Sequence, residues 1–131
     1  MVGILKVSQG SVMALHGVML LAKNSGKTMT TKDAAESLSV SEAHLSKMLQ
    51  RLGKAGILRS IRGPNGGYML VQGLSELRLL DIIEAVEGPV DISPCRFGAP
   101  ACRKGSCVVG GLFADLNAQV LRHFEKRLSE I

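Results

Sequence analysis

The sequence predicts a mainly α-helical protein with a small β-hairpin wing, arranged as a winged helix-turn-helix followed by a long C-terminal helix. Two observations lead to this prediction. Leu and Ala are frequent whereas Trp is absent and Tyr occurs once, so aliphatic side chains must build the core, and such a composition favours helices. The local signals also follow the order helix, helix, helix, hairpin, which is that of a winged helix. With 131 residues, 46% of them apolar, the chain suffices for one domain and a few additional elements.

Each of the first three helices is predicted to begin after a hydroxyl side chain that can cap it and to end at residues that favour turns. Glu42 adds a negative charge to the first turn of the third helix, which suits the positive end of the helix dipole. The predicted helices span residues 9–23, 31–37 and 42–55, after the caps Ser8, Thr30 or Thr31, and Ser41.

A hairpin and two further helices complete the expected fold, because a stretch dense in turn formers separates two short apolar runs. The expected elements are strands over 57–61 and 68–71, helices over 77–86 and from 107 or 108 to 128, and a loop over 90–107. We therefore divide the chain into a winged-helix domain (1–88), a cysteine loop (89–107) and a C-terminal helix (108–131).

The positive charge is concentrated in one stretch of the sequence. The net charge is only +5, but residues 43–75 contain no Asp or Glu. The cations of that stretch are Lys47, Arg51, Lys54, Arg59 and Arg62. An uncompensated positive field of this kind favours an anionic polymer, most commonly nucleic acid, over the alternative of a solvated basic face.

The third predicted helix has an apolar face and an opposite polar face. The apolar positions, which should pack on the core, are Leu45, Met48, Leu49 and Leu52. The basic positions on the other side are His44, Lys47, Arg51 and Lys54. Early residues of a recognition helix reach base edges and later ones meet phosphates. The predicted base contacts are Ala43, His44 and Lys47, and the predicted phosphate contacts are Arg51, Lys54 and the helix start at Ser41.

The turn between the two strands is expected to form the wing. Its glycines let the backbone approach closely, Pro64 stiffens it, and Arg62 is a single cation on a thin loop, which suits the narrow minor groove. The predicted wing contacts are Arg62, Gly63, Pro64 and Asn65. The turn lacks the Gly-Lys-Ser/Thr ending of a nucleotide phosphate loop and precedes no helix, so the alternative is an ordinary hairpin turn.

Three cysteines form the second candidate site. Cys95, Cys102 and Cys107 follow the pattern C-x6-C-x4-C, and three thiolates suit an iron–sulfur cluster or zinc, with free thiols as the remaining alternative. The spacing lacks the close pairs of a zinc ribbon. A fourth ligand is needed, and His16 is the best candidate, although a lone histidine on an apolar helix is commonly a core residue. A thiol enzyme is disfavoured because no histidine lies near these cysteines in sequence.

No secretory signal is apparent, and the apolar run over 12–22 is too short to cross a bilayer, so we expect a cytoplasmic protein without a membrane partner. Cysteines in that compartment more often bind metals or act in redox chemistry than form disulfides.

These residues resemble one bacterial family over nearly the whole chain, the iron–sulfur cluster regulators of the IscR/NsrR type. The segments that carry the resemblance are LGKAGIL (52–58), IRGPNGGY (61–68) and DIIEAVEG (81–88), followed by the three cysteines. The resemblance implies a homodimeric transcription regulator that binds a two-fold site in double-stranded DNA, holds a cluster on the three cysteines and places Arg62 in the minor groove. It also implies a dimerisation helix with a seam of Val109, Leu112, Phe113, Leu116, Val120 and Phe124.

The chain departs from the family pattern at the fourth ligand and in the recognition helix. Gly110 stands where IscR-like members carry a histidine, and residues 8–12 lack the carboxylate that NsrR-like members supply from the partner's first helix. His16 resembles a first-helix histidine that binds the cluster in other members, so two-iron and four-iron clusters both remain open. Ser46 lies near the position at which IscR-like members can carry an acidic specificity residue, so their DNA preference does not transfer. The alternatives are a regulator that uses free thiols or structural zinc, and an adaptor that binds proteins.

Overall fold

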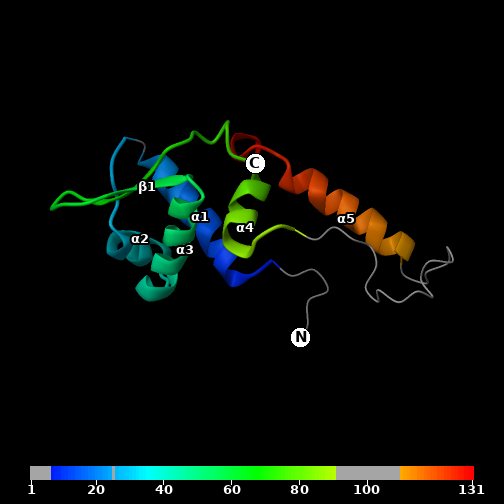
Figure 1. Ribbon diagram of the computed structural model, residues 1–131, viewed down its shortest axis with the longest axis horizontal. Helices are drawn as coiled ribbons and strands as arrows, with labels where there is room; N and C mark the ends of the chain where they lie inside the picture. Colours follow the sequence, from blue (N-terminus) through cyan, green and yellow to red (C-terminus); the bar gives the residue numbers. More distant parts are fainter. Residues whose placement is uncertain (1–6, 25, 91–109) are drawn as a thin grey trace.

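The computed structural model describes residues 7–24, 26–90 and 110–131. Its elements are α1 (Gln9–Lys23), α2 (Thr31–Leu38), α3 (Glu42–Lys54), β1 (Leu58–Ile61), β2 (Gly67–Leu70), α4 (Leu79–Glu87), α5 (Gly110–Phe124) and a short 3-10 helix, η2 (Leu128–Glu130) (Figure 1). This order confirms the predicted winged helix. The loop with the three cysteines lies outside the described residues.

The three predicted N-caps are confirmed. The hydroxyl of Ser8 accepts a hydrogen bond from the backbone N–H of Ser11 at 3.1 Å. Thr30 does the same for Asp33 at 3.1 Å, and Ser41 for His44 at 3.3 Å. Each cap satisfies one backbone donor that the first turn of a helix leaves without a partner, so these side chains fix where α1, α2 and α3 begin.

The core lies where α1 packs against both α3 and α4. The predicted apolar face of α3 is confirmed, because its four residues are at most 4% exposed. The two helices pack tightly at Gly17, where a Cβ would make ordinary van der Waals contact with Leu49 and Leu45 at 3.6 and 3.8 Å. The largest fully buried side chains are Leu45, Leu49, Leu52, Leu77, Ile82 and Val18. Dense packing of aliphatic side chains therefore holds α3 in place and leaves its other side in solvent.

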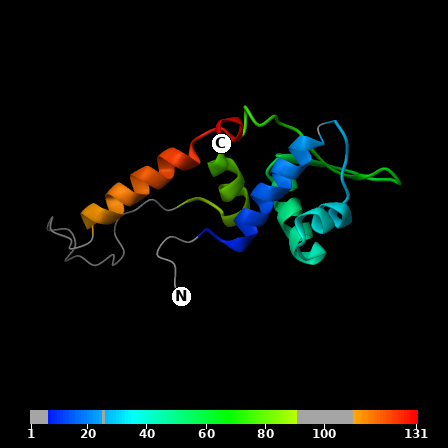
Figure 2. The same cartoon turned by 180° about the vertical axis from the view of Figure 1, so that it is seen from behind.

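The wing is an antiparallel hairpin in which Leu58 pairs with Leu70 and Ile61 with Gly67. It projects beyond the helices at one end of the molecule (Figure 1), as the view from behind also shows (Figure 2). The chain between α1 and α2 pairs with β2 near the turn, because Met29 and Tyr68 exchange two backbone hydrogen bonds of 3.0 and 2.8 Å. The wing is thereby fixed to the body of the domain.

The last helix ends earlier than the sequence predicted. The prediction extended it to Leu128, whereas α5 ends at Phe124 and the chain then turns back onto residues 74–79. The backbone N–H groups of Leu128 and Ser129 donate to the carbonyls of Leu77 and Leu74 at 2.8 and 3.1 Å, and the Leu128 side chain is 4% exposed. Burial of Leu128 stabilises this turned-back conformation more than additional helical turns would stabilise a longer α5. We call residues 126–129 the C-terminal strap.

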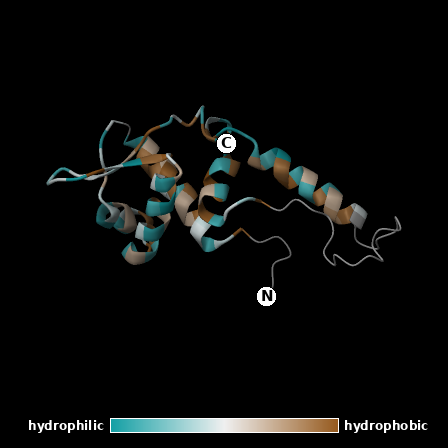
Figure 3. Ribbon diagram, viewed as in Figure 1, coloured by the Kyte–Doolittle hydropathy of each residue, from teal (hydrophilic) through white to brown (hydrophobic). Residues whose placement is uncertain are grey.

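The helix α5 extends away from the body on the side opposite the wing (Figures 1 and 2). Its surface alternates hydrophobic and hydrophilic bands (Figure 3). Residues 111–124 of α5 are all exposed or half-buried, and Leu112 is 60% exposed. No helix in the described part of the chain is both long and apolar enough to cross a membrane.

Candidate nucleic-acid interface

The solvent side of α3 is the first part of the candidate interface. Ala43, Lys47, Gln50 and Lys54 are all exposed. They lie at intervals of 4, 3 and 4 residues and therefore share one face of the helix, opposite the buried leucines. Ser41, which caps the helix, is exposed at its start. This face carries two cations and no acid, so it presents a positive surface with short side chains near the helix start.

The four basic residues that were predicted on one side of α3 lie in two different environments. Lys47 and Lys54 point to solvent, whereas His44 is half-buried and Arg51 is engaged, its guanidinium donating to the Val86 carbonyl at 3.0 Å. A shallow groove runs along this flank of α3, between the start of α1 and the end of α4. Its lining residues are Ser8, Gly10, His44, Lys47, Met48, Arg51, Val86 and Glu87. The DNA contacts assigned to His44 and Arg51 remain predictions. Both residues lie at the edge of the outward face of α3.

Glu87 closes this groove at the start of α1. One carboxylate oxygen accepts from the backbone N–H of Ser8 at 3.0 Å. Hydrogen bonds from Ser8 lower the pKa of Glu87, and partial burial opposes them. The hydroxyl of Ser11 is buried and finds no hydrogen-bond partner of standard geometry among the described residues, but it lies near enough to help stabilise the charged carboxylate. A negative charge here also suits the positive end of the α1 dipole.

The tip of the wing is the second part of the candidate interface. Arg62, Gly63, Pro64 and Asn65 are all exposed. The backbone N–H of Gly66 donates to the Gly63 carbonyl at 2.9 Å, which makes residues 63–66 a tight turn with Pro64 in its second position. Glycine is required at 66, since a side chain would meet the Ile61 carbonyl oxygen at 2.3 Å. The Thr28 hydroxyl donates to the Asn65 carbonyl at 2.7 Å and braces the tip.

Sequence reasoning missed Gln50 as a part of this surface, and it named the cation Arg59 without assigning it a DNA contact. Gln50 lies on the outward face of α3, where its side-chain amide donates to the Ser46 hydroxyl at 3.3 Å. Arg59 is exposed on β1 opposite Met69. Gln50 is neutral, so a charge pattern does not reveal it, although its spacing from Lys47 and Lys54 places it on their face. Thr28 was also missed, because nothing in its sequence context pairs it with a residue 37 positions later.

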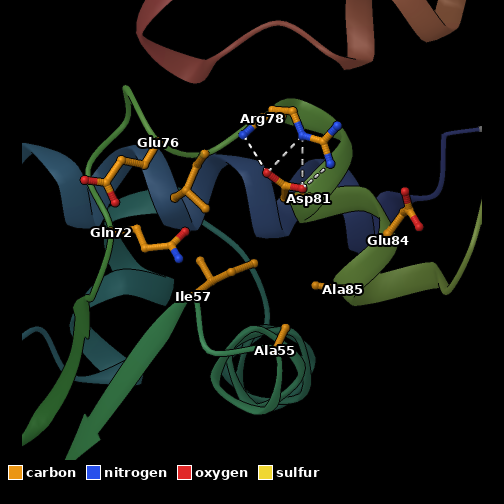
Figure 4. Close-up of a pocket in the computed structure, with 9 residues that line it drawn as sticks. Ala55, Ile57, Gln72, Glu76, Arg78, Asp81, Glu84 and Ala85 are labelled. Carbon is orange, nitrogen blue, oxygen red and sulfur yellow. Dashed lines mark hydrogen bonds and ion pairs between the residues drawn. The ribbon is translucent and has the colours of Figure 1, made fainter.

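A second hollow lies between the end of α3, the segment that follows β2 and the exposed side of α4 (Figure 4). Within it the Arg78 guanidinium and the Asp81 carboxylate are 2.7 Å apart. Burial favours the protonated form of Asp81, but the hydrogen bonds and charge of Arg78 prevail and lower the pKa of Asp81. Glu76 and Glu84 also line this hollow, which therefore does not suit an anionic ligand. We assign the ion pair a structural role at the start of α4.

His16 is exposed on α1 and is not a core residue. It lies in a shallow, mainly apolar hollow with Val12, Met13, Leu38 and Val40. The part of the chain that the structure describes contains no group of three or more His, Cys, Asp or Glu side chains that could hold a metal ion. A metal group at His16 would need its other ligands from outside the described residues or from a second chain.

The fold and the exposed cationic helix place the chain in the winged helix-turn-helix class. The chain belongs to the Rrf2 family, whose model is described as "Iron-dependent Transcriptional regulator" and matches residues 7–129. This assignment confirms the resemblance to IscR-type regulators. The family and the relatives below are transcriptional regulators and not enzymes, as the sequence predicted.

Three relatives illustrate the similarity. IscR of Photorhabdus laumondii is 35% identical over 89 residues, which are 67% of this chain and 54% of that protein. The structure of CymR, the global cysteine regulator of B. subtilis, matches with a TM-score of 0.78 and 30% identity over 96% of this chain and 95% of that one. T. potens IscR matches with a TM-score of 0.71 and 24% identity over 93% and 81% of the two chains, and supports the fold alone. The chain spans about half to two thirds of the curated relatives that it matches.

Proposed function

We propose that this protein is a transcription regulator that binds double-stranded DNA as a homodimer, with α3 in the major groove and the wing in the minor groove. The observation that carries the proposal is the exposed surface of α3 and the wing, built from residues 43–75, where five cations stand without an acid. Shape supports it as well, because α3 is the second helix of a helix-turn-helix and the wing presents Arg62 on a braced turn.

The variant Arg62→Ala tests this role of the wing. We expect it to weaken binding to a duplex that the protein has selected from a random pool by about 5- to 150-fold, the equivalent of roughly 1–3 kcal/mol. Arg122→Ala is the matched control, since Arg122 is an exposed arginine on α5. Fluorescence anisotropy at fixed salt measures both. Equal affinity of the two variants would refute the wing contact, and failure of the wild type to bind any duplex would favour the adaptor alternative.

The proposed dimer contact is the apolar side of α5. Leu112, Leu116 and Val120 are exposed or half-buried, and their spacing of four residues gathers them on one helix face. A second copy of α5 would cover them. Leu112→Glu should shift the protein to monomer in sedimentation, whereas Asp115→Asn, a change at an exposed residue of the same helix, should leave it dimeric. If Leu112→Glu remained dimeric, the dimer contact would not lie on this face of α5.

We further propose that an iron–sulfur cluster controls DNA affinity and that Cys95, Cys102 and Cys107 would hold it. The donor set fits, because three thiols within thirteen residues and an accessible imidazole at His16 are ligands that iron accepts. When bound, such a group would supply one-electron redox chemistry and sensitivity to oxidants. The IscR relative and the family description support this proposal. In this proposal the chain has three parts: the DNA-binding domain up to residue 88, the cysteine loop up to residue 107, and the dimerisation helix after it.

The alternative is that the cysteines act as free thiols. The match to CymR, a cysteine regulator, supports this alternative. Anaerobic purification followed by iron and sulfide analysis separates the two. We expect stoichiometric iron and acid-labile sulfide, lost in Cys102→Ser. A colourless protein that contains zinc or no metal would overturn the cluster. His16→Ala should lower iron content only if the imidazole is a ligand, and His123→Ala on α5 is the control.

A further inference from the structure

The last turn of α4 is held by two long-range hydrogen bonds. The Arg51 guanidinium, on α3, donates to the Val86 carbonyl at 3.0 Å. One residue later, the Glu87 carboxylate accepts from the Ser8 backbone at the start of α1. The two contacts join elements that are 35 and 79 residues apart in sequence. The end of α4 is therefore tied directly to the helix that forms the centre of the candidate interface.

The physical reason for the Arg51 contact lies in how α4 ends. The N–H of Gly88, which has φ +84°, donates to the Glu84 carbonyl at 2.9 Å. Pro89 has no N–H to offer to the carbonyl of Val86. The last carbonyls of a helix carry partial negative charge and need donors from outside it, and an arginine there also suits the helix dipole. Arg51 supplies that donor.

The same guanidinium stands beside the outward face of α3. Arg51 is exposed and lines a groove with Lys47, which belongs to the proposed DNA-binding face. Among the described residues, Glu87 is the one acid that lines this groove, and its carboxylate accepts a hydrogen bond from Ser8. A phosphate that approached this flank would therefore be an alternative acceptor for Arg51, and the carbonyl of Val86 would lose its donor.

We propose that Arg51 is a positioning residue shared between two acceptors: the end of α4 and a DNA phosphate compete for its guanidinium. The inference rests on the proposed DNA binding and adds how that binding is regulated. The chain leaves α4 two residues before the cysteine segment begins at residue 89. Any change in that segment that moves the Val86 carbonyl would release Arg51 to DNA or withdraw it, without moving the core of α3.

The sequence offers a direct probe of this competition. Val86-Glu87 is the one place in the chain where valine precedes glutamate. Labelling with carbonyl-¹³C valine and ¹⁵N glutamate therefore gives a single correlation peak that reports on the Val86 carbonyl. In the free protein, Arg51→Ala should shift this peak, because the carbonyl loses its donor. Addition of a duplex selected from a random pool should move the wild-type peak towards the Arg51→Ala position.

The outcomes separate this inference from the proposed function. If the duplex binds and the wild-type peak stays in place, Arg51 keeps its α4 contact and the competition is overturned. If no duplex binds at all, DNA binding itself fails. Salt dependence gives a second readout, since Arg51→Ala should reduce the slope of log affinity against log salt by about one. Arg122→Ala should leave that slope unchanged.

A double-mutant cycle tests the regulatory part. Glu87→Gln weakens the anchor of α4 on α1, so it should loosen the Val86 contact and raise DNA affinity by about threefold in the wild type. In the Arg51→Ala background this gain should vanish. An equal gain in both backgrounds would show that Glu87 acts only through its negative charge near DNA, and the proposed coupling through Arg51 would be refuted.

Discussion

The substitution Gly67→Ala tests how the wing is attached to the domain. A Cβ at position 67 would lie 2.3 Å from the Met29 carbonyl oxygen and 2.9 Å from the Thr30 nitrogen, and the backbone there has φ +146°. The bridge between this part of β2 and the Met29–Thr30 linker must then open. The two hydrogen bonds between Met29 and Tyr68, about 1 kcal/mol each, would be lost. With about 1–2 kcal/mol for the unfavourable φ, we expect a destabilisation of roughly 3–4 kcal/mol.

Urea unfolding followed by circular dichroism measures this destabilisation, and Gly73→Ala is the matched control. At position 73 the nearest atom to a new Cβ is the Ser75 hydroxyl oxygen at 3.9 Å, so the cost should stay within about 0.5 kcal/mol. DNA affinity should also fall in Gly67→Ala by a factor close to that of Arg62→Ala, because the tip loses its support. Equal stability of the two glycine variants would refute the contact between the wing and the linker.

Three further predictions follow from burial and charge. Leu52→Ala should destabilise the fold by about 2–5 kcal/mol in urea unfolding, whereas Gln50→Ala on the exposed face should cost less than about 0.5 kcal/mol; similar losses would contradict the packing of α3. Leu128→Ala should cost about 2–4 kcal/mol and speed amide exchange at Ser129, and unchanged exchange would mean that the strap is not held by that side chain. The pKa of Glu87 is lowered from its usual value of 4.5, so its charged carboxylate stabilises the fold at a pH above 4.5 and this contribution is lost as the pH falls. The stability of Glu87→Gln should therefore decrease less on acidification than that of the wild type. Identical acid unfolding curves would exclude the Ser8 contact.

Local signals in the sequence sufficed for most of the fold. Ser8, Thr30 and Ser41 each cap the helix they were expected to cap, because capping depends on residues only three positions apart. The buried face of α3 followed from its apolar spacing. The end of α5 could not be predicted in this way, since the helix stops where Leu128 finds a buried place against residues far away in sequence.

The candidate interface was predicted in outline and not in detail. Periodicity placed Lys47 and Lys54 on the solvent side of α3, but it could not show that Arg51 reaches across to the Val86 carbonyl. A contact of that kind depends on how α3 and α4 cross, which the sequence of either helix alone does not determine. The cysteine site remains a prediction from residue chemistry and family resemblance.

The C-terminal strap has a geometric consequence for a dimer joined along α5. The strap fixes the end of α5 to the segment before α4, so the direction of this helix, about 22 Å long, is set relative to the wing and α3. Two copies would then hold their α3 helices at a fixed distance from each other. Inserting one residue into the last turn of α5, so that the helix gains one residue, would rotate the parts on either side of it by about 100° relative to each other. It should change the spacing of the preferred half-sites while leaving affinity for a single half-site intact.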